Sequence, residues 1–468
     1  MSKHHDVSRS RFNRFKFDTG KLSVVATIFL PVLIETALSQ FYNVVDMMMV
    51  GRDNPDGLAA IGLTSNPLSI FLSIFSAVNV GTTTLVAWHV GAKKLKDAQD
   101  VSRTSLWMNL FLGILMTVFG MLMAKPIVYF MGGDEEVMRL AVDYYDILVV
   151  GTTFQALTYS VTAAMRGAGL SKVPMIYNTV SNLLNVGGNY VLIYGKFGFR
   201  PMGVIGAGYS TLISRIICCI WALLYMFFAK TPISFRTHYG KYRFSWSQVR
   251  QMLRIGIPTA VETLIMNCGS MLFVKIVNML GKVAFSTHQI CGSLNGFISA
   301  PATALSVTSN TVVGQYLGAG EFDTAKKYNN YLCKTSFLLS VVMTTLINIF
   351  WRPLIGCYAT ADQTEIIALA HTIFIILSIQ YLTGYTNGVL MGTMRGAGDT
   401  RFAMLLNTLG FFCFRIPLSY LFGITFGWGL EGIWLALIAH SWLNTICLFL
   451  RYRSGRWIET FRRTNAKG

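Results

Sequence analysis

The sequence has few charged residues for its length. Asp, Glu, Lys and Arg together make up 13% of the 468 residues, about half the fraction found in a soluble domain. This excludes soluble enzymes and soluble binding modules, whose surfaces need more charge. Hydrophobic residues account for 53% of the chain. The solvent around most of this protein is therefore expected to be lipid.

Motifs for catalysis, metal binding and secretion are also missing. The eight Cys residues include the adjacent pair Cys218 and Cys219 but no zinc-site spacing, and we interpret them as small buried hydrophobic residues. The scattered His residues form no catalytic constellation. The basic residues 1–21 lead into an apolar stretch that is too long for a signal peptide. We expect no enzyme activity, no cofactor, no resident metal and no cleavable signal.

Long apolar runs are abundant. A helix needs about 20 apolar residues to cross a hydrocarbon layer roughly 30 Å thick, and lipid leaves backbone polar groups no partner outside the helix. The sequence predicts an all-α integral membrane protein with about twelve spans, at residues 22–50, 58–88, 101–124, 138–160, 173–195, 205–229, 253–279, 284–316, 328–350, 364–390, 400–422 and 428–450.

The distribution of positive charge predicts the orientation in the membrane. The net charge is +18. With the N-terminus on the inside, 29 of the 39 Lys and Arg residues fall on inner tails, loops and span ends, seven on the outer side and three within spans. Inner loops are rich in Lys and Arg. We expect a multi-pass protein of the cell membrane with both termini cytoplasmic, and no nucleic-acid partner.

The chain contains an internal duplication. The pentapeptide Met-Arg-Gly-Ala-Gly at 165–169 recurs at 394–398. Other landmarks recur in the same order, namely Pro31-x-x-x-Glu35 as Pro258-x-x-x-Glu262, Gly91-Ala92 as Gly318-Ala319, and Asn66 as Asn295. Membrane proteins with two related halves are typically secondary transporters with a site between the halves.

The duplication divides the chain into two lobes of six spans. We expect a basic tail at 1–21, an N-lobe at 22–229, a cytoplasmic linker at 230–252, a C-lobe at 253–450 and a basic tail at 451–468. Because each half has an even number of spans, both halves have the same orientation. A pseudo-two-fold axis along the membrane normal should relate them, with a cavity between.

Three acids within spans are candidates for function, because a membrane-embedded charge is costly. Glu35 and Asp46 lie eleven residues apart, on one helix face and about 16 Å apart along the axis. Ser39 and Tyr42 lie between them on that face, as in a cavity wall. Glu262 is the third acid. The alternative is that Asp46 lies at the outer interface and that Glu35 simply pairs with a base.

The fifth span carries four asparagines on one helical face, spaced four, three and four: Asn178, Asn182, Asn185 and Asn189. In the second half only Asn407 is retained, and the next three positions are Phe411, Phe414 and Leu418. Loss of the stripe from one half favours a binding role for it in the N-lobe. The alternative is that the amides join neighbouring helices. Arg215 and Arg415 are expected to be deep counter-charges to Glu35 or Glu262.

These motifs together resemble the multidrug and toxic compound extrusion family over nearly the whole chain. The resemblance depends on Pro31 to Asp46, Gly-Ala after the second span, and Arg-Gly-Ala-Gly after the fourth and tenth. The stretch from Asn185 to Gly198 is most similar to the NorM-like branch. The resemblance to the family implies a V-shaped pair of lobes. Asp46 matches an aspartate where the family places a coupling ion or substrate.

The resemblance implies an antiporter for multidrug efflux. A monomer would export small cationic amphipathic compounds by alternating access in exchange for H⁺ or Na⁺, with Na⁺ near Asp46. Two departures leave the coupling ion open, because Asn189 stands where proton-coupled relatives often have aspartate, and 380–384 lacks the tenth-span acid of sodium-coupled ones. A flippase of lipid-linked precursors is the main alternative, and a receptor or channel is weaker.

Overall fold

The computed structural model describes residues 21–53, 55–132, 134–236, 242, 244–356 and 363–466, and nearly all of them are helical with no strand among them. The expected N-terminal tail, apart from residue 21, and part of the linker lie outside the described residues. The elements are α2 (Lys21–Asp53), α3 (Pro55–Gly91), α4 (Leu95–Met131), α5 (Glu135–Gly167), α6 (Lys172–Tyr194), α7 (Gly203–Phe228), α8 (Trp246–Asn278), α9 (Lys282–Gly318), α10 (Phe322–Gly356), α11 (Thr364–Gly396), α12 (Thr400–Leu409), η2 (Gly410–Arg415), α13 (Ile416–Tyr420), η3 (Leu421–Thr425), α14 (Gly429–Arg453) and α15 (Arg456–Asn465).

Each of the twelve expected spans lies within a helical segment or runs past its end by one residue, and several helices extend up to seven residues beyond the expected span. Eleven described segments are long and apolar enough to cross a membrane. The twelfth is α6, a 23-residue helix outside that set. Its asparagine stripe accounts for the lower hydropathy. The all-α membrane fold predicted from sequence is confirmed.

The eleventh span departs from a regular α-helix after Leu409. It consists of α12, η2, α13 and η3, with Pro417 near the start of α13. Proline lacks the backbone N–H, and π-helical turns appear where the regular hydrogen-bond ladder is interrupted. Its counterpart α6 in the first half is continuous. The two halves therefore differ in this helix.

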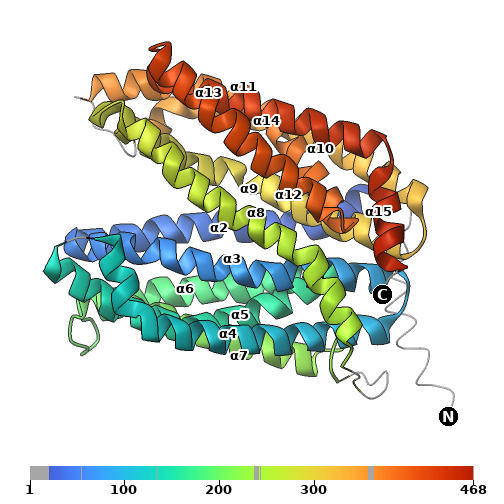
Figure 1. Cartoon of the computed structure of the whole chain (residues 1–468). Helices are drawn as coiled ribbons and strands as arrows, with labels where there is room; N and C mark the ends of the chain where they lie inside the picture. Colours follow the sequence, from blue (N-terminus) through green and yellow to red (C-terminus); the bar gives the residue numbers. More distant parts are fainter. Residues whose placement is uncertain are drawn as a thin grey trace.

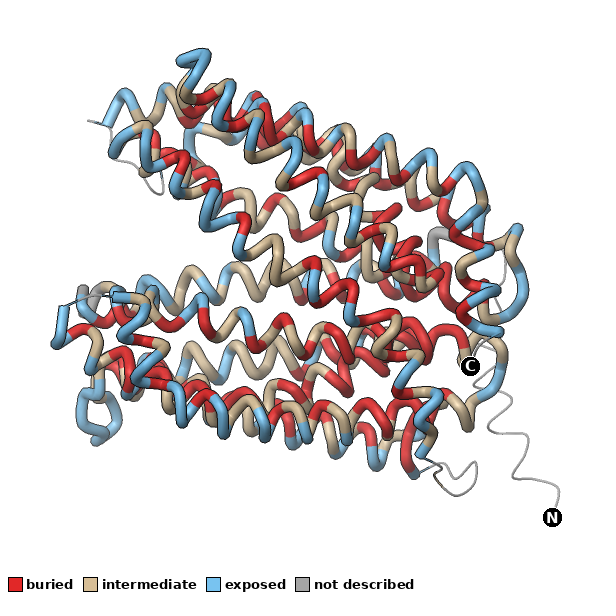
Figure 2. The backbone as a smooth tube through the Cα atoms, viewed as in Figure 1, coloured by how far each residue is buried: buried red, intermediate tan, exposed pale blue. Residues whose placement is uncertain are grey.

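The helices form two groups in a V-shaped arrangement. In Figure 1, α2 to α7 form the lower group, α8 to α14 form the upper group, and the groups diverge toward the left. They converge on the right, where α15 and the C-terminus lie. Figure 2 shows many buried residues where the groups converge and mainly exposed or half-buried ones at the diverging ends.

Glycines permit the close approach at the converging end. A methyl group on Gly91, at the end of α3, would lie 1.8 Å from the carbonyl oxygen of Gln315. One on Gly318, at the end of α9, would lie 2.0 Å from the carbonyl oxygen of Trp88. Gly318 is the equivalent of Gly91, and Gln315 is the equivalent of Trp88, each 227 positions later in the chain. Only glycine allows backbones to pack this closely, and it does so symmetrically in both halves.

Candidate functional site

Glu35 is held by a guanidinium and an amide inside the first half. Its side chain is buried, and Oε1 lies 2.8 Å from Nη2 of Arg166. Nδ2 of Asn178 donates to the same oxygen at 2.7 Å. A buried charge is tolerated when it is paired and hydrogen-bonded. Glu35 therefore pairs with a base, as the alternative interpretation of the sequence expected.

The second half repeats this arrangement. Oε1 of Glu262 lies 3.8 Å from Nη2 of Arg395 and accepts a hydrogen bond from Nδ2 of Asn407 at 2.5 Å. Asn444 in turn donates to Oδ1 of Asn407. The three members of the set are separated from their counterparts by 227 or 229 residues. Each half thus contains one buried carboxylate–guanidinium–amide set.

The prediction that Arg215 and Arg415 neutralise the two glutamates is wrong. Arg215 faces a cavity in the first half and its Nη1 lies 3.5 Å from the carbonyl oxygen of Leu148. The Arg415 guanidinium lies 4.4 Å from the ring centroid of Phe273 and 4.8 Å from that of Phe411. Arg166 at the end of α5 and Arg395 at the end of α11 pair with the glutamates instead, because these helices end beside them.

The polar faces of α2 and α6 lie opposite each other in a constant register. Residue i of α2 pairs with residue i + 143 of α6 at Glu35–Asn178, at Ser39–Asn182 (3.5 Å) and at Asp46–Asn189. Asn185 instead donates to Thr211 of α7 at 3.1 Å. Parallel helices with matched polar stripes produce this constant offset. The asparagines therefore do join helices, and they do so around a cavity.

The cavity of about 580 Å³ lies within the first half, between α2, α3, α5, α6 and α7. The predicted residues Ser39, Tyr42, Asn182 and Asn185 line it together with both acids of α2. Further polar residues that were not predicted also line the wall: Tyr144, Gln155, Thr158, Tyr159, Ser181, Thr211 and Ser214. Asn189, fully buried, supports Asp46 from behind the lining.

The second half is apolar at the matching place. Phe273 occupies the position equivalent to Asp46, and Phe411 the position equivalent to Asn182. Both rings are buried, and Arg415 lies against both. Glu262 has its arginine and amide partners there, but α8 carries no second acid. The polar wall is thus a property of the first half.

A family model described as MatE matches residues 31–191 and 258–421, which is more than half of the chain. The chain belongs to the MatE family. The two matched segments fall one in each predicted lobe. This confirms the resemblance drawn from the repeated motifs.

Full-length relatives support the MatE assignment. A protein of Bacillus subtilis (strain 168) named uncharacterized transporter YisQ is 29% identical, covering 92% of this chain and 93% of its own length. A probable multidrug resistance protein NorM of Thermotoga maritima is 27% identical, with 92% and 91% covered. The similarity to the NorM-like branch is therefore confirmed.

Solved MatE structures have the same fold. A MATE in complex with MaL6 has a TM-score of 0.88 at 19% identity, covering 94% of this chain and 97% of that one. A multidrug resistance MATE family transporter in an outward-facing conformation has a TM-score of 0.87 at 19% identity, with 94% and 96% covered. The two lobes predicted from the duplication, in the V shape that the family resemblance implies, are thus the fold of this MatE chain.

A second cavity of this MatE protein, of about 250 Å³, lies between the halves. Arg166 and Arg395 both line it, together with Asn79, Asn310 and Tyr159. Tyr159 and Leu72 also line the larger cavity, so the two cavities share part of their walls. The paired arginines therefore connect the buried glutamates with the space between the lobes.

Arg166 and Arg395 are the functional candidates that sequence reasoning missed. In the sequence they stand out only as part of the repeated pentapeptide Met-Arg-Gly-Ala-Gly. A signal was present, since a glutamate and an arginine that are both duplicated at nearly the same offset (227 and 229) form a plausible pair in each half.

Proposed function

We propose that this protein is a multidrug exporter that moves small, cationic amphipathic compounds across the cell membrane in exchange for a smaller cation. The names of its relatives, probable multidrug resistance proteins, support export of drugs. The carboxylate of Asp46 in the polar cavity supports a cationic substrate, because an acid in a low-dielectric wall attracts positive charge. Aromatic and aliphatic wall residues suit the apolar part of such a compound.

Asp46 is the proposed exchanging acid. Glu35 is neutralised by Arg166, whereas Asp46 forms no ion pair among the described residues and accepts a hydrogen bond from the neutral amide of Asn189. This difference between the two acids is the observation that carries the proposal. An uncompensated carboxylate binds either a coupling ion or a cationic substrate, and competition between the two is sufficient for antiport.

Glu35 and Glu262 have a different proposed role. Each holds an arginine at the end of α5 or α11, beside the space between the lobes. Neutralising one of them would release its arginine and change the contacts between lobes. We propose that they couple occupation of the cavity to lobe movement.

The proposed transport cycle moves the lobes 22–229 and 253–450 about their converging end. Positive charge on inner loops supports placing this end, with both termini, at the cytoplasm. The described conformation would then open outward. Loading Asp46 from outside neutralises the site, releases the drug and favours return to an inward-facing state.

The coupling ion is proposed to be H⁺. A proton needs only one carboxylate with an amide neighbour, and Asp46 with Asn189 provides this pair. Na⁺ needs several oxygen ligands, and Asp46 and the adjacent amides of α6 also offer these. Drug efflux from proteoliposomes decides between them. A monomeric exporter coupled to protons should move substrate under a pH gradient alone and show no response to a sodium gradient. No efflux under either gradient would contradict the antiport function.

A further inference from the structure

The cavity of the first half contains a positive charge as well as its two acids. Among the described residues that line this cavity of about 580 Å³, only Arg215, Glu35 and Asp46 are charged. Arg215 lies one turn after Thr211, on the face of α7 that is turned toward the cavity. Because Glu35 forms an ion pair with Arg166, the other two charges remain, one of each sign.

Arg215 has few contacts for a half-buried guanidinium. Its Nη1 donates one hydrogen bond, to the carbonyl oxygen of Leu148 at 3.5 Å, and it forms no ion pair or ring contact with the described residues. A guanidinium has five N–H donors, so most of them are free to bind a ligand. A charge in a low-dielectric wall is costly unless an opposite charge accompanies it.

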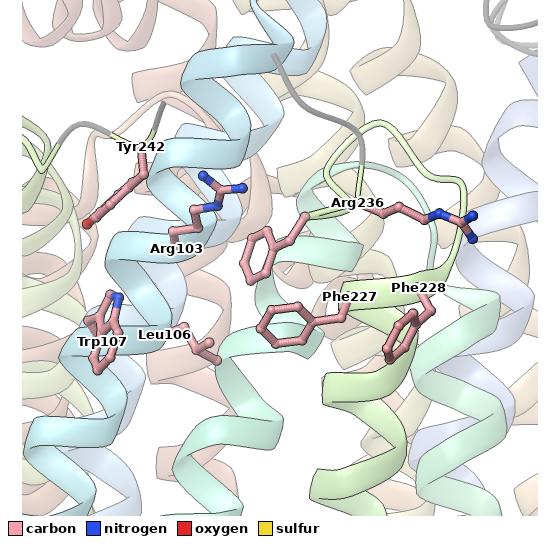
Figure 3. A pocket seen from close by; sticks show the side chains of 8 residues that line it. Arg103, Leu106, Trp107, Phe227, Phe228, Arg236 and Tyr242 are labelled. Atoms are coloured by element: carbon pink, nitrogen blue, oxygen red, sulfur yellow. The ribbon is translucent and has the colours of Figure 1, made fainter. Parts of the chain in front are cut away.

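Three other arginines of the membrane helices have a partner inside the protein. Arg166 pairs with an acid, and Arg415 lies against two rings. Arg103 of α4 lies 4.9 Å from the ring centroid of Phe235, in a groove of about 820 Å³ on α4 and α7 that is shown in Figure 3. Arg215 differs from these three because it adjoins a cavity that can admit a ligand.

The two remaining charges of the cavity lie at different depths. Ser181 of α6 donates a hydrogen bond to the carbonyl oxygen of Ser214, the residue before Arg215, at 3.1 Å. Asn189, eight residues further along α6, donates to Asp46. Eight residues of α-helix span about 12 Å. A ligand that meets both charges therefore carries its own two charges at well-separated positions.

We propose that Arg215 binds an anionic oxygen of the transported compound, whose cationic amine is bound by Asp46. This inference rests on the proposed export function and refines its substrate class to zwitterions with an amine and a carboxylate on one apolar scaffold. A guanidinium donates two parallel N–H bonds to a carboxylate. Tyr42, Tyr144 and Tyr159 of the cavity wall suit the scaffold between the two charges. Arg215 is then a specificity-determining residue.

Binding of two dyes that differ by one charge tests this proposal. Tetramethylrhodamine carries a cationic ring system and a free carboxylate, and its methyl ester has the same scaffold without the negative charge. With fluorescence anisotropy in phosphatidylcholine nanodiscs, and empty discs as the baseline, Arg215→Met should weaken binding of tetramethylrhodamine about 10- to 100-fold. Binding of the methyl ester should be unchanged or tighter. Arg215→Lys keeps the charge and should retain part of the preference for the free carboxylate.

The matched control is Arg103→Met, which removes a half-buried arginine of the same half that does not line the polar cavity. This control should bind both dyes like the unaltered protein. Equal changes for the two dyes in Arg215→Met, or no change for tetramethylrhodamine, would overturn the proposal. Failure of the unaltered protein to bind tetramethylrhodamine would overturn it as well. Circular dichroism of each variant shows whether it has folded.

Efflux of the methyl ester from proteoliposomes separates this inference from the proposed function. The ester lacks the group that Arg215 recognises, so its efflux should depend on Asp46 and not on Arg215. No efflux of the ester by the unaltered protein would contradict the export function. Normal efflux of the ester, together with unchanged binding of tetramethylrhodamine by Arg215→Met, would contradict only the role of Arg215.

Discussion

The indole Nε1 of Trp88 donates a hydrogen bond to the carbonyl oxygen of Gly396 at 2.7 Å. The equivalent residue in the second half, Gln315, donates through Nε2 to Gly167 at 3.0 Å. Each bond joins the two halves, because Gly396 directly follows Arg395 and Gly167 directly follows Arg166. The converging end is therefore held by two symmetric bonds adjacent to the Glu35 and Glu262 sets.

Replacing Trp88 by Phe should loosen this end. The substitution keeps a ring for packing against Phe461, whose centroid lies 4.9 Å away, but removes the donor. A buried carbonyl left without its donor costs about 1–3 kcal/mol. We expect faster hydrogen exchange at the ends of α3 and α11 and a lower melting temperature. Trp442→Phe, at an exposed position of α14, is the control, and equal exchange in both variants would contradict a role for this bond.

A methyl group at Gly91 should separate the ends of α3 and α9. Because its Cβ would lie 1.8 Å from a backbone oxygen, the helices must move apart, at a cost of about 1–3 kcal/mol or more. Gly91→Ala is expected to lower thermal stability and abolish transport. In Gly62→Ala, on the same helix, the methyl group meets nothing within 4 Å. That variant should be unchanged or slightly more stable, since alanine favours helix.

The Glu35–Arg166 pair should give a favourable coupling energy. Arg166→Met leaves the buried carboxylate without its cation, and Glu35→Gln leaves the guanidinium without its anion. The double variant removes both charges, so its loss of stability should be smaller than the sum of the two single losses by about 1–3 kcal/mol. Denaturant unfolding of all four proteins measures this. Strict additivity would mean that the pair contributes nothing beyond its separate side chains.

Asp46→Asn should abolish coupled efflux without loss of expression. The substitution preserves the size of the side chain and its contact with Asn189 but removes the charge that binds either cation. We expect drug resistance in a sensitive host, and efflux under a pH gradient, to fall to the level of cells or vesicles without the protein. Asp143→Asn changes an exposed aspartate of α5 in the same way. Full resistance in the Asp46 variant would refute its role.

The helices and the duplication were predictable from local patterns. Hydrophobic runs of sufficient length specify spans without reference to their neighbours, because lipid forces the backbone to bond within each helix. The stripe of α2 was also predicted to line a cavity, and it lines the cavity of about 580 Å³ together with Asn178, Asn182 and Asn185 of α6. Helical periodicity places such residues on one face wherever the helix packs.

Partners across the fold were not predictable in the same way. Glu35 and Arg166 are 131 residues apart, and their contact depends on where α5 ends relative to α2. Arg415 lies on an apolar helix, where a buried acid seemed the natural partner, yet it lies against two aromatic rings. Cation–π contacts satisfy a guanidinium without an acid, and no sequence pattern distinguishes the two outcomes.

By itself, the sequence determined that this chain crosses a membrane many times, that its halves are copies, and that α2 carries two acids on one face. These properties follow from hydropathy, spacing and repetition, which act along a single helix. Only the tertiary structure decided which acid is neutralised, because an ion pair of a few ångströms depends on the relative position of two helices. That packing leaves Asp46, and not Glu35, without a cationic partner among the described residues.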